Sequence, residues 1–411
     1  PGGALDTCSS LLLPADQLVL LDLPDAETAH DSPLVLAPAG ALVPARLAAP
    51  APLRLGAVLT LSVDAGRVRA GMRAVLRDAS GAGLCLDGDG HDVMAWFDQR
   101  ATDEAREITR TGHPLVAQQG GTMWPEMQLP KLMWLKRHRP DLWARTARAL
   151  DLADDLAAGL TGVAARSICT TVAKWPWLGH WPDDLLAMLG MEDLPARAAL
   201  SSPRAVGSPI APLTPGAAAR LGLSPDTLVA TGMVDAFAGV LGAAALSASA
   251  PDRSIGVLVA GTSASIMTLG PVPLARPGIW GPYPGAVDEM RSISEGGLTA
   301  AGGLLDHLID GWPLAGGARP DHGAVLTRIE ALLAEHGPAF GAGLHILPDF
   351  AGTRAPNTDP LARGVISGLS MDRSLDGLCR MVWRASLAIA LGLRQVLERM
   401  ALPLDRMVMV G

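Results

Sequence analysis

Apolar residues follow a helical spacing most clearly near the end of the chain. From Ser374 to Leu402 the period is that of an amphipathic helix, with apolar positions at Leu375, Leu378, Val382, Ala385, Ile389, Leu393, Val396 and Met400. Pro403 predicts the end of this helix, because proline cannot continue the backbone hydrogen bonding. The next residues, Met407–Val410, predict a strand that leads into Gly411.

Two short apolar runs in the middle of the chain predict a β-hairpin. The runs Ile255–Ala260 and Ala264–Leu269 flank the small residues Gly261, Thr262 and Ser263, as expected of paired strands around a tight turn. Small residues with backbone N–H and hydroxyl groups let a phosphate approach closely. The turn is therefore a candidate phosphate site.

A single carboxylate interrupts the apolar run before this hairpin. Leu228–Thr231 predicts a strand that gives way to a helix, and Asp235 lies at the junction. An acid among apolar residues is costly unless a partner or a reaction uses it. Asp235 and the Gly261–Ser263 turn together point to phosphoryl transfer, while Asp235 as a helix N-cap stays an open structural alternative.

The first half of the chain has weaker patterns. Residues 1–56 are rich in Ala, Leu and Pro, and their prolines leave few segments long enough for a packed helix. Leu84–Leu86 and Val93–Phe97 predict strands, and helices are predicted from about Glu126 and over Asp141–Leu150. The prolines of residues 201–215 predict a linker between two halves, and we place the domains at residues 1–226 and 227–411.

Length and composition narrow the class of protein. A chain of 411 residues is too long for one ordinary core, and its 33 basic and 41 acidic residues include no long basic run, so nucleic acid is not an expected partner. The four cysteines, Cys8, Cys85, Cys169 and Cys379, lie far apart, which predicts free thiols in a reducing cytosol. Asp235 argues against a membrane helix in its apolar run, so a cytoplasmic protein is expected.

A series of short blocks stands in a fixed order along the chain: Ala95–Ala101, Trp124–His138, Ser167–Trp175, Met233–Ala236, Gly261–Ser263, Gly278–Tyr283, Ser294–Ala300 and Leu347–Pro360. Together they resemble the FGGY carbohydrate kinases, specifically the pentulose-kinase branch that includes D-ribulokinases. The resemblance covers about residues 57–411. It implies an α/β fold of two actin-like (ribonuclease H-like) domains with a cleft between them, the sugar on the N-terminal side and ATP on the C-terminal side.

The resemblance also assigns roles to residues. By match of motif, Asp235 is the general base that takes the proton from the sugar's primary hydroxyl, and Gly261, Thr262 and Ser263 bind the phosphates of ATP, which Mg²⁺ accompanies. One aligned carboxylate suffices for such a hydroxyl acceptor. Lys174 and Glu295 fall where ribulokinase-like members hold their ketose, and we expect both to converge on Asp235.

The residues proposed for the sugar have structural alternatives. Lys174 could instead pack its stem on neighbouring tryptophans at the surface, and Glu295 could be the N-terminal partner of a helix at residues 296–298. Asp98 and Arg100 are expected to form a structural ion pair, while Asp349 and Arg354 could only shape a loop.

Some family motifs are altered in this chain. The family opens with an Asp-x-Gly-Thr turn that holds ATP phosphates and magnesium; here Asp6 is the nearest match and the Gly-Thr is missing. Asp78 and Ala79 stand where the branch reads Asp-Ala-Thr-Cys-Ser and are candidate substrate contacts, but the residues after them differ. The Gly-rich adenine loop that the family places after Met407–Gly411 does not follow.

These departures predict a truncated kinase that binds a pentulose weakly and ATP poorly. They also predict an uncovered apolar face on the Ser374–Leu402 helix, which favours association such as a homodimer. The first expected function is an ATP-dependent kinase that phosphorylates the primary hydroxyl of a pentulose such as D-ribulose. The alternative is a non-catalytic kinase-like remnant that keeps the sugar cleft. An ATPase of the actin/Hsp70 type shares the fold class but gives no reason for Lys174 and Glu295 beside Asp235.

Overall fold

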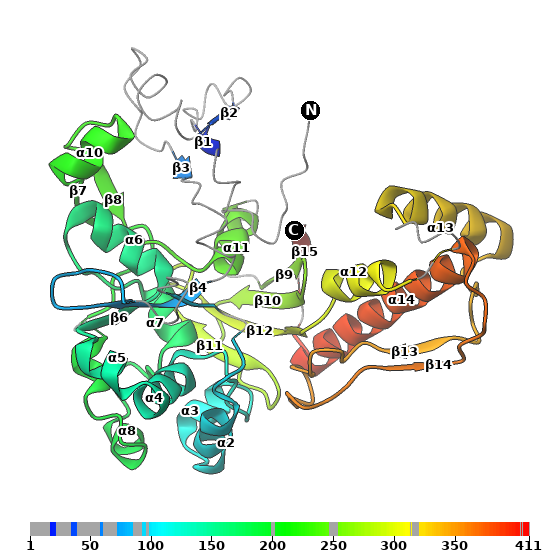
Figure 1. The fold of residues 1–411 in the computed structure, drawn as a ribbon, viewed down its shortest axis with the longest axis horizontal. Helices are drawn as coiled ribbons and strands as arrows, with labels where there is room; N and C mark the ends of the chain where they lie inside the picture. The colour runs from blue at the N-terminus through cyan, green and yellow to red at the C-terminus, as the bar shows by residue number, and fades with distance from the viewer. Residues whose placement is uncertain are drawn as a thin grey trace. The chain divides into compact units, whose positions relative to one another are not determined.

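The computed structural model describes residues 17–21, 34–38, 58–60, 72–84, 93–95, 98–198, 202–245, 254–312, 314, 320–402, 404 and 406–410. The chain divides into two compact units, which are described separately (Figure 1). The first comprises Pro1–Leu115, Met123–Leu241 and Tyr283–Met290, and the second comprises Val116–Thr122, Gly242–Pro282 and Arg291–Gly411. Each unit is therefore discontinuous in sequence.

Helices surround short strands in the first unit. Its helices are α2 (Thr102–Arg110), α4 (Gln128–His138), α5 (Pro140–Arg145), α6 (Leu152–Thr161), α7 (Ile168–Lys174), α8 (Asp183–Met188), α9 (Leu194–Arg197), α10 (Pro215–Leu221) and the start of α11 (Asp235–Ala245). Its strands are β1 (Gln17–Leu21), β2 (Leu34–Pro38), β3 (Val58–Thr60), β4 (Met72–Arg77), β5 (Val93–Ala95), β6 (Arg148–Leu150), β7 (Pro209–Pro212) and β8 (Leu228–Ala230). They form sheets of order β2-β1-β3, β5-β4-β6 and β7-β8.

Two sequence predictions for this unit are wrong. The helix predicted over residues 141–150 ends at Arg145, because Thr146 is extended and Arg148–Leu150 pairs with β4 as β6. The proline-rich stretch 201–215 is not a linker between units, since it contains β7, which pairs antiparallel with β8 inside the first unit. The predicted strand at residues 93–97 is present as β5, whereas Cys85 and Leu86 lie outside the described residues.

A five-stranded sheet organises the second unit, in the order β11-β12-β10-β9-β15. The strands are β9 (Ile255–Ala260), β10 (Ala264–Gly270), β11 (Trp280–Pro284), which runs across a unit boundary, β12 (Ser292–Leu298) and β15 (Arg406–Val410). β10 pairs antiparallel with both β9 and β12, and β15 pairs parallel with β9. The predicted hairpin and the predicted strand at 407–410 are confirmed.

The predicted long helix is confirmed as α14 (Leu375–Met400). Ser374 is its N-cap, with the hydroxyl accepting a hydrogen bond from Gly377 N at 3.1 Å. Its N-terminal part packs against the helices and the strand pair of this unit, α12 (Gly302–Asp310), α13 (His322–His336), β13 (His345–Leu347) and β14 (Val365–Ser367) (Figure 1). Its last turns cover the sheet, where Val396 and Met400 are buried with Ile266 and Ile279.

Within the described residues, no helix combines the length and the apolar character that a membrane span requires.

The helix α3 (Pro114–Gln118) crosses a boundary between the units. Gly278 N in the second unit donates to Gly120 O just after it, at 2.9 Å.

Candidate functional site

Asp235 is the first residue of α11 and follows the short connection from β8. Its side chain is exposed, although the residues after it in the helix turn inward, Phe237 and Val240 being fully buried. One carboxylate oxygen, Oδ1, accepts a hydrogen bond from Ala236 N at 2.8 Å. The backbone thus orients one oxygen of an acid whose side chain remains open to solvent.

Lys174 is the last residue of α7 and is 6% exposed. Its ammonium nitrogen lies 6.0 Å from the centroid of the Phe237 ring, two residues beyond Asp235. Its burial excludes the alternative of a lysine at the surface. Within the first unit, the end of α7 thus lies near the first turn of α11.

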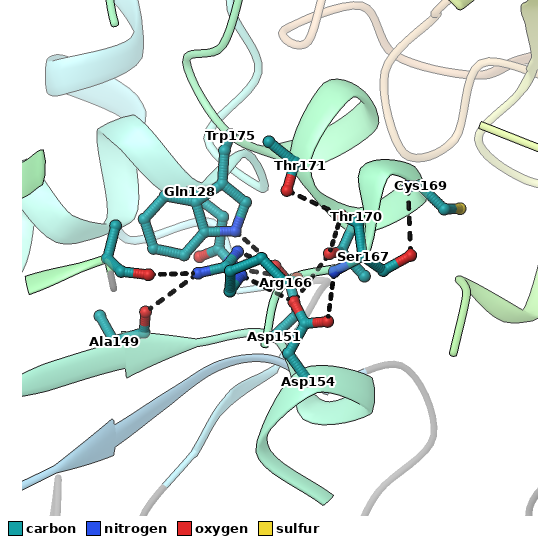
Figure 2. A network of polar contacts seen from close by, with 11 residues as sticks. Gln128, Ala149, Asp151, Asp154, Arg166, Ser167, Cys169, Thr170, Thr171 and Trp175 are labelled. Atoms are coloured by element: carbon teal, nitrogen blue, oxygen red, sulfur yellow. Dashed lines mark hydrogen bonds and ion pairs between the residues drawn. The ribbon is translucent and has the colours of Figure 1, made fainter. Parts of the chain in front are cut away.

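Asp154 of α6 holds the N-terminal end of α7 (Figure 2). Its Oδ1 accepts from Ser167 N at 3.0 Å and its Oδ2 accepts from the Thr170 hydroxyl at 2.7 Å. Ser167 is also the N-cap of α7 and accepts from Cys169 N. Because these groups are buried, the hydrogen bonds satisfy polar atoms that water does not reach.

Asp151 holds the other end of the same helix. Its carboxylate accepts from the indole N–H of Trp175, the residue after Lys174, and from Gln128 Nε2 at 3.0 Å. Arg166 lies between the two carboxylates, with Nε 2.9 Å from Asp154 Oδ2 and Nη2 3.4 Å from Asp151 Oδ2 (Figure 2). The Arg166 side chain is fully buried, and its guanidinium lies 4.4 Å from the Trp175 ring centroid.

Cys169 links α7 to the connection that carries Asp235. Burial raises the pKa of its thiol to about 12, although the nearby Val234 amide lowers it by hydrogen bonding. Val234 immediately precedes Asp235. Cys169 and Cys379 are both buried and form no disulfide within the described residues, whereas Cys8 and Cys85 lie outside the described residues.

The hairpin turn Gly261–Ser263 packs against the start of α12 in the second unit. Gly261 O accepts from Gly302 N at 2.8 Å, and Thr262 O accepts from Ala301 N at 2.9 Å and from Gly303 N at 3.1 Å. The first amides of α12 are thus used by the carbonyls of the turn. Gly261 N donates to Ser263 O at 2.9 Å, so an anion at this turn would be met by the turn's remaining amides and its hydroxyls, not by the end of the helix.

The close contact requires glycine in α12. A Cβ on Gly302 would lie 2.6 Å from Gly261 O, and one on Gly303 would lie 2.9 Å from Thr262 Cγ2. The glycine pair therefore sets how near the turn lies to the helix. Thr262 is exposed at the tip of the turn.

Glu295 lies in the middle of β12 and is 7% exposed. The alternative of a helix at residues 296–298 is wrong, because these residues continue the strand opposite β10. Oε1 of Glu295 accepts from the Ser265 hydroxyl at 2.8 Å, while Oε2 is buried and has no hydrogen-bond partner in the described part of the chain. A buried carboxylate oxygen in this state is a site for a donor.

A narrow gap in the second unit adjoins this carboxylate, and the residues around it include Trp280, Glu295 and Arg354. The Arg354 guanidinium is 5.1 Å from the Trp280 ring centroid. Partial burial raises the pKa of Asp349. Among the described residues, Glu295 and Asp235 belong to different units, so their convergence stays a prediction.

The remaining candidates differ in what the structure shows. Asp98 and Arg100 form the predicted ion pair, with Arg100 Nε 2.8 Å from Asp98 Oδ2. Asp78 engages its own turn, accepting from Ser80 N at 2.8 Å, Ser80 Oγ at 2.6 Å and Ala82 N at 3.0 Å, and Ala79 is exposed. Their sugar contact stays a prediction, and Asp6 lies outside the described residues.

A resident metal site does not emerge from the part of the chain that is described, since no three His, Cys, Asp or Glu residues cluster there. Mg²⁺ in phosphoryl-transfer enzymes is held by one or two carboxylates together with the phosphates of the substrate. The described residues are therefore compatible with a Mg²⁺ ion that arrives together with a nucleotide.

The sheet order and the mixed pairing of the second unit, together with an acid at a strand–helix junction in the first, define a two-domain α/β protein with an actin-like sheet. The chain belongs to the FGGY family of carbohydrate kinases. The family's N-terminal domain matches residues 90–242 and its C-terminal domain matches residues 256–411. The predicted family and fold class are thereby confirmed.

Curated relatives agree with this assignment. The chain is 36% identical over 344 residues to an FGGY carbohydrate kinase domain-containing protein of Danio rerio, which covers 78% of this chain and 62% of the relative. It is 30% identical over 357 residues to a D-ribulokinase of Saccharomyces cerevisiae, covering 75% of this chain and 50% of the relative. The chain spans 62% of the length of the Danio rerio and Homo sapiens relatives.

Solved structures share the fold. A xyloylose kinase from Brucella ovis matches with a TM-score of 0.64 and 21% identity, covering 83% of this chain and 66% of the other. A xylulose kinase from Rhodospirillum rubrum matches with a TM-score of 0.61 and 25% identity, covering 80% and 63%.

Proposed function

We propose that this protein is an ATP-dependent kinase that phosphorylates the primary hydroxyl of a pentulose such as D-ribulose. The observation that carries the proposal is the pairing of Lys174 with the start of α11. A buried ammonium group and an exposed, backbone-oriented carboxylate lie on adjacent elements of one unit. Similarity to a D-ribulokinase supports a pentulose as the acceptor.

Asp235 acts as the general base in this proposal. The sugar hydroxyl gives its proton to the carboxylate as its oxygen attacks the γ-phosphorus, and the bond to the bridging oxygen of ADP breaks. Asp235 suits this role because its side chain is exposed while Ala236 N fixes one of its oxygens. No covalent intermediate on the protein is needed.

In this proposal Lys174 of the first unit and Glu295 of the second unit both bind the sugar. The ammonium of Lys174 donates to a carbonyl or hydroxyl oxygen of the ketose. Glu295 accepts from a hydroxyl through Oε2, the oxygen that lacks a partner within the described residues. Binding a hydroxyl there removes the cost of leaving a buried acceptor unsatisfied.

The Gly261–Ser263 turn receives the nucleotide's phosphates. Its residues are small, Thr262 is exposed at the tip, and Ser263 adds a second hydroxyl group to the turn. When bound with ATP, Mg²⁺ would neutralise charge on the phosphates. The turn's amides and hydroxyls would hold the phosphate oxygens in place for transfer.

A coupled ADP-release assay tests the proposal on the protein, with D-ribulose compared against other pentuloses, hexoses and glycerol. The expected result is ATP- and ketose-dependent ADP release, with the phosphate on the primary carbon of the product by ³¹P NMR. Calorimetry with the same sugars separates the alternative, a protein that keeps sugar binding without turnover. Sugar binding without ADP release would support that alternative, and neither binding nor turnover would refute both.

A further inference from the structure

We propose that the buried carboxylates Asp151 and Asp154, joined by Arg166, position α7 and thereby set where Lys174 lies relative to Asp235. These residues do not touch the sugar, so they are positioning residues. The proposal rests on the proposed function, since it concerns the lysine and the base of that reaction. We refer to Asp151, Asp154 and Arg166 as the α7 clamp.

The need for a clamp follows from the length of α7. The helix has seven residues, and a helix this short is not stable on its own in water. Its location must therefore come from contacts at its surface and ends. Lys174 lies in its last turn, so any shift of the helix moves the ammonium group.

The α7 clamp contacts both ends of the helix. Asp154 binds Ser167 N and the Thr170 hydroxyl at the start, and Asp151 binds the Trp175 indole directly after Lys174 (Figure 2). Arg166 pairs with both carboxylates and donates to Ala198 O at 2.8 Å. The side chains of Arg166, Asp151 and Asp154 are 0%, 7% and 2% exposed.

Burial makes this arrangement stiff. Charged groups out of water are held strongly only when geometry is good, and removing one partner leaves an uncompensated charge. Moving α7 away from the clamp would leave buried charges without a partner, which opposes such a displacement. Such a device is consistent with a site whose geometry must be kept to within a fraction of an ångström.

α7 also contacts the segment that carries the base. Cys169 contacts the Val234 amide, next to Asp235, and the Lys174 ammonium faces the Phe237 ring. A displaced α7 would thus disturb both the lysine and the connection that carries the carboxylate. Changes at the clamp should appear as altered sugar use and not only as lower stability.

Paired variants at Thr170 test the proposal. Thr170→Val keeps the shape of the side chain but removes the hydroxyl group that donates to Asp154, whereas Thr170→Ser keeps that hydroxyl. Thr146→Val is the control, because it also deletes a buried hydroxyl group but does so away from α7. The Thr146 hydroxyl donates to Leu142 O at 2.8 Å. For Thr170→Val we expect kcat/KM for the sugar to fall about tenfold. KM for ATP should stay within about twofold, and Thr170→Ser and Thr146→Val should both resemble wild type.

The result that would overturn the proposal is equal sugar kinetics for Thr170→Val and Thr146→Val at matched loss of thermal stability. Impairment of Thr170→Ser to the level of Thr170→Val would do the same. If Thr170→Val does not fold, Trp175→Phe removes the donor to Asp151 and carries the same expectation.

Hydrogen exchange distinguishes failure of this inference from failure of the proposed function. If the wild-type protein transfers no phosphoryl group to any sugar, the proposed function fails while the clamp remains testable. Thr170→Val should then still speed amide exchange over residues 231–237, and Thr146→Val should not. Unchanged exchange over these residues in Thr170→Val would refute the clamp by itself.

Discussion

Gly302→Ala probes the phosphate turn while leaving the sequence of the turn unchanged. Gly302 N donates to Gly261 O at 2.8 Å, and a Cβ at residue 302 would lie 2.6 Å from that oxygen and 3.2 Å from the Gly261 carbonyl carbon. Ordinary contact begins near 3.4 Å, so the turn and the helix must separate by the 0.8 Å between 3.4 and 2.6 Å. Alanine is itself the better helix former by about 1 kcal/mol, so the change does not weaken α12 locally.

The size of the kinetic effect follows from this displacement. Because a misplacement of about 1 Å can cost about 10²-fold in rate, we expect kcat/KM for ATP to fall roughly 10- to 100-fold. KM for the sugar should change little, since the contact involves only the hairpin and α12. The coupled ADP-release assay at varied ATP measures the first effect, and calorimetry with an ATP analogue separates binding from turnover.

A matched control is available in the same unit. Gly343 is exposed, and a Cβ there would meet no heavy atom within 4 Å, so Gly343→Ala should leave ATP kinetics unchanged. Wild-type ATP kinetics in a folded Gly302→Ala protein would refute the assignment of this turn to the phosphates.

Three further predictions concern the lysine, a thiol and an acid. Lys174→Met keeps the length of the side chain but removes its charge. Loss of a charged hydrogen bond of about 1.5–3 kcal/mol should raise KM for the sugar roughly 10- to 100-fold and leave KM for ATP unchanged. An unaltered KM for the sugar would show that Lys174 does not bind it. Burial raises the pKa of Cys169 to about 12, so mass spectrometry should find it unlabelled by iodoacetamide in the native protein and labelled in urea; rapid native labelling would contradict its burial. Partial burial acts to raise the pKa of Asp193, but hydrogen bonds from Lys136, Trp143 and Arg197 lower it by more. The net result is a pKa below the usual range of an aspartate. Its stabilising effect is therefore present above the unfolded pKa of about 3.9 and lost as pH falls through the folded pKa, so Asp193→Asn should flatten the acid side of the urea-midpoint profile; an unchanged profile would contradict this.

Local signals explain which elements were predictable from the sequence. α14 carries a helical repeat over its whole length and a serine N-cap, and the β9–β10 hairpin has two apolar runs around small residues. The strand β6 has no such signal, because Arg148–Leu150 becomes a strand by pairing with β4, far away in the chain. Pairing of this kind is a tertiary property.

The sequence singles out Asp235 as the candidate base but does not show which residues hold α7 in place. Asp235 stands out as an acid in an apolar run, whereas the role of Arg166 depends on which acids it meets after folding. Asp151 and Asp154 stand close together in the sequence, but no local pattern shows that they bind Trp175 and Thr170. Burial of Lys174 likewise depends on α11, a later element of the chain.

The central claim is that Asp235 is the base of a phosphoryl transfer, and Asp235→Asn measured beside Asp226→Asn tests it most directly. Asp226 is an exposed acid in the turn before β8, so its variant controls for the loss of one surface charge. We expect Asp235→Asn to keep its fold and its affinity for the sugar, and to lower kcat by a factor on the order of 10² to 10⁴, while Asp226→Asn retains wild-type turnover. Turnover near the wild-type level in Asp235→Asn would contradict the account.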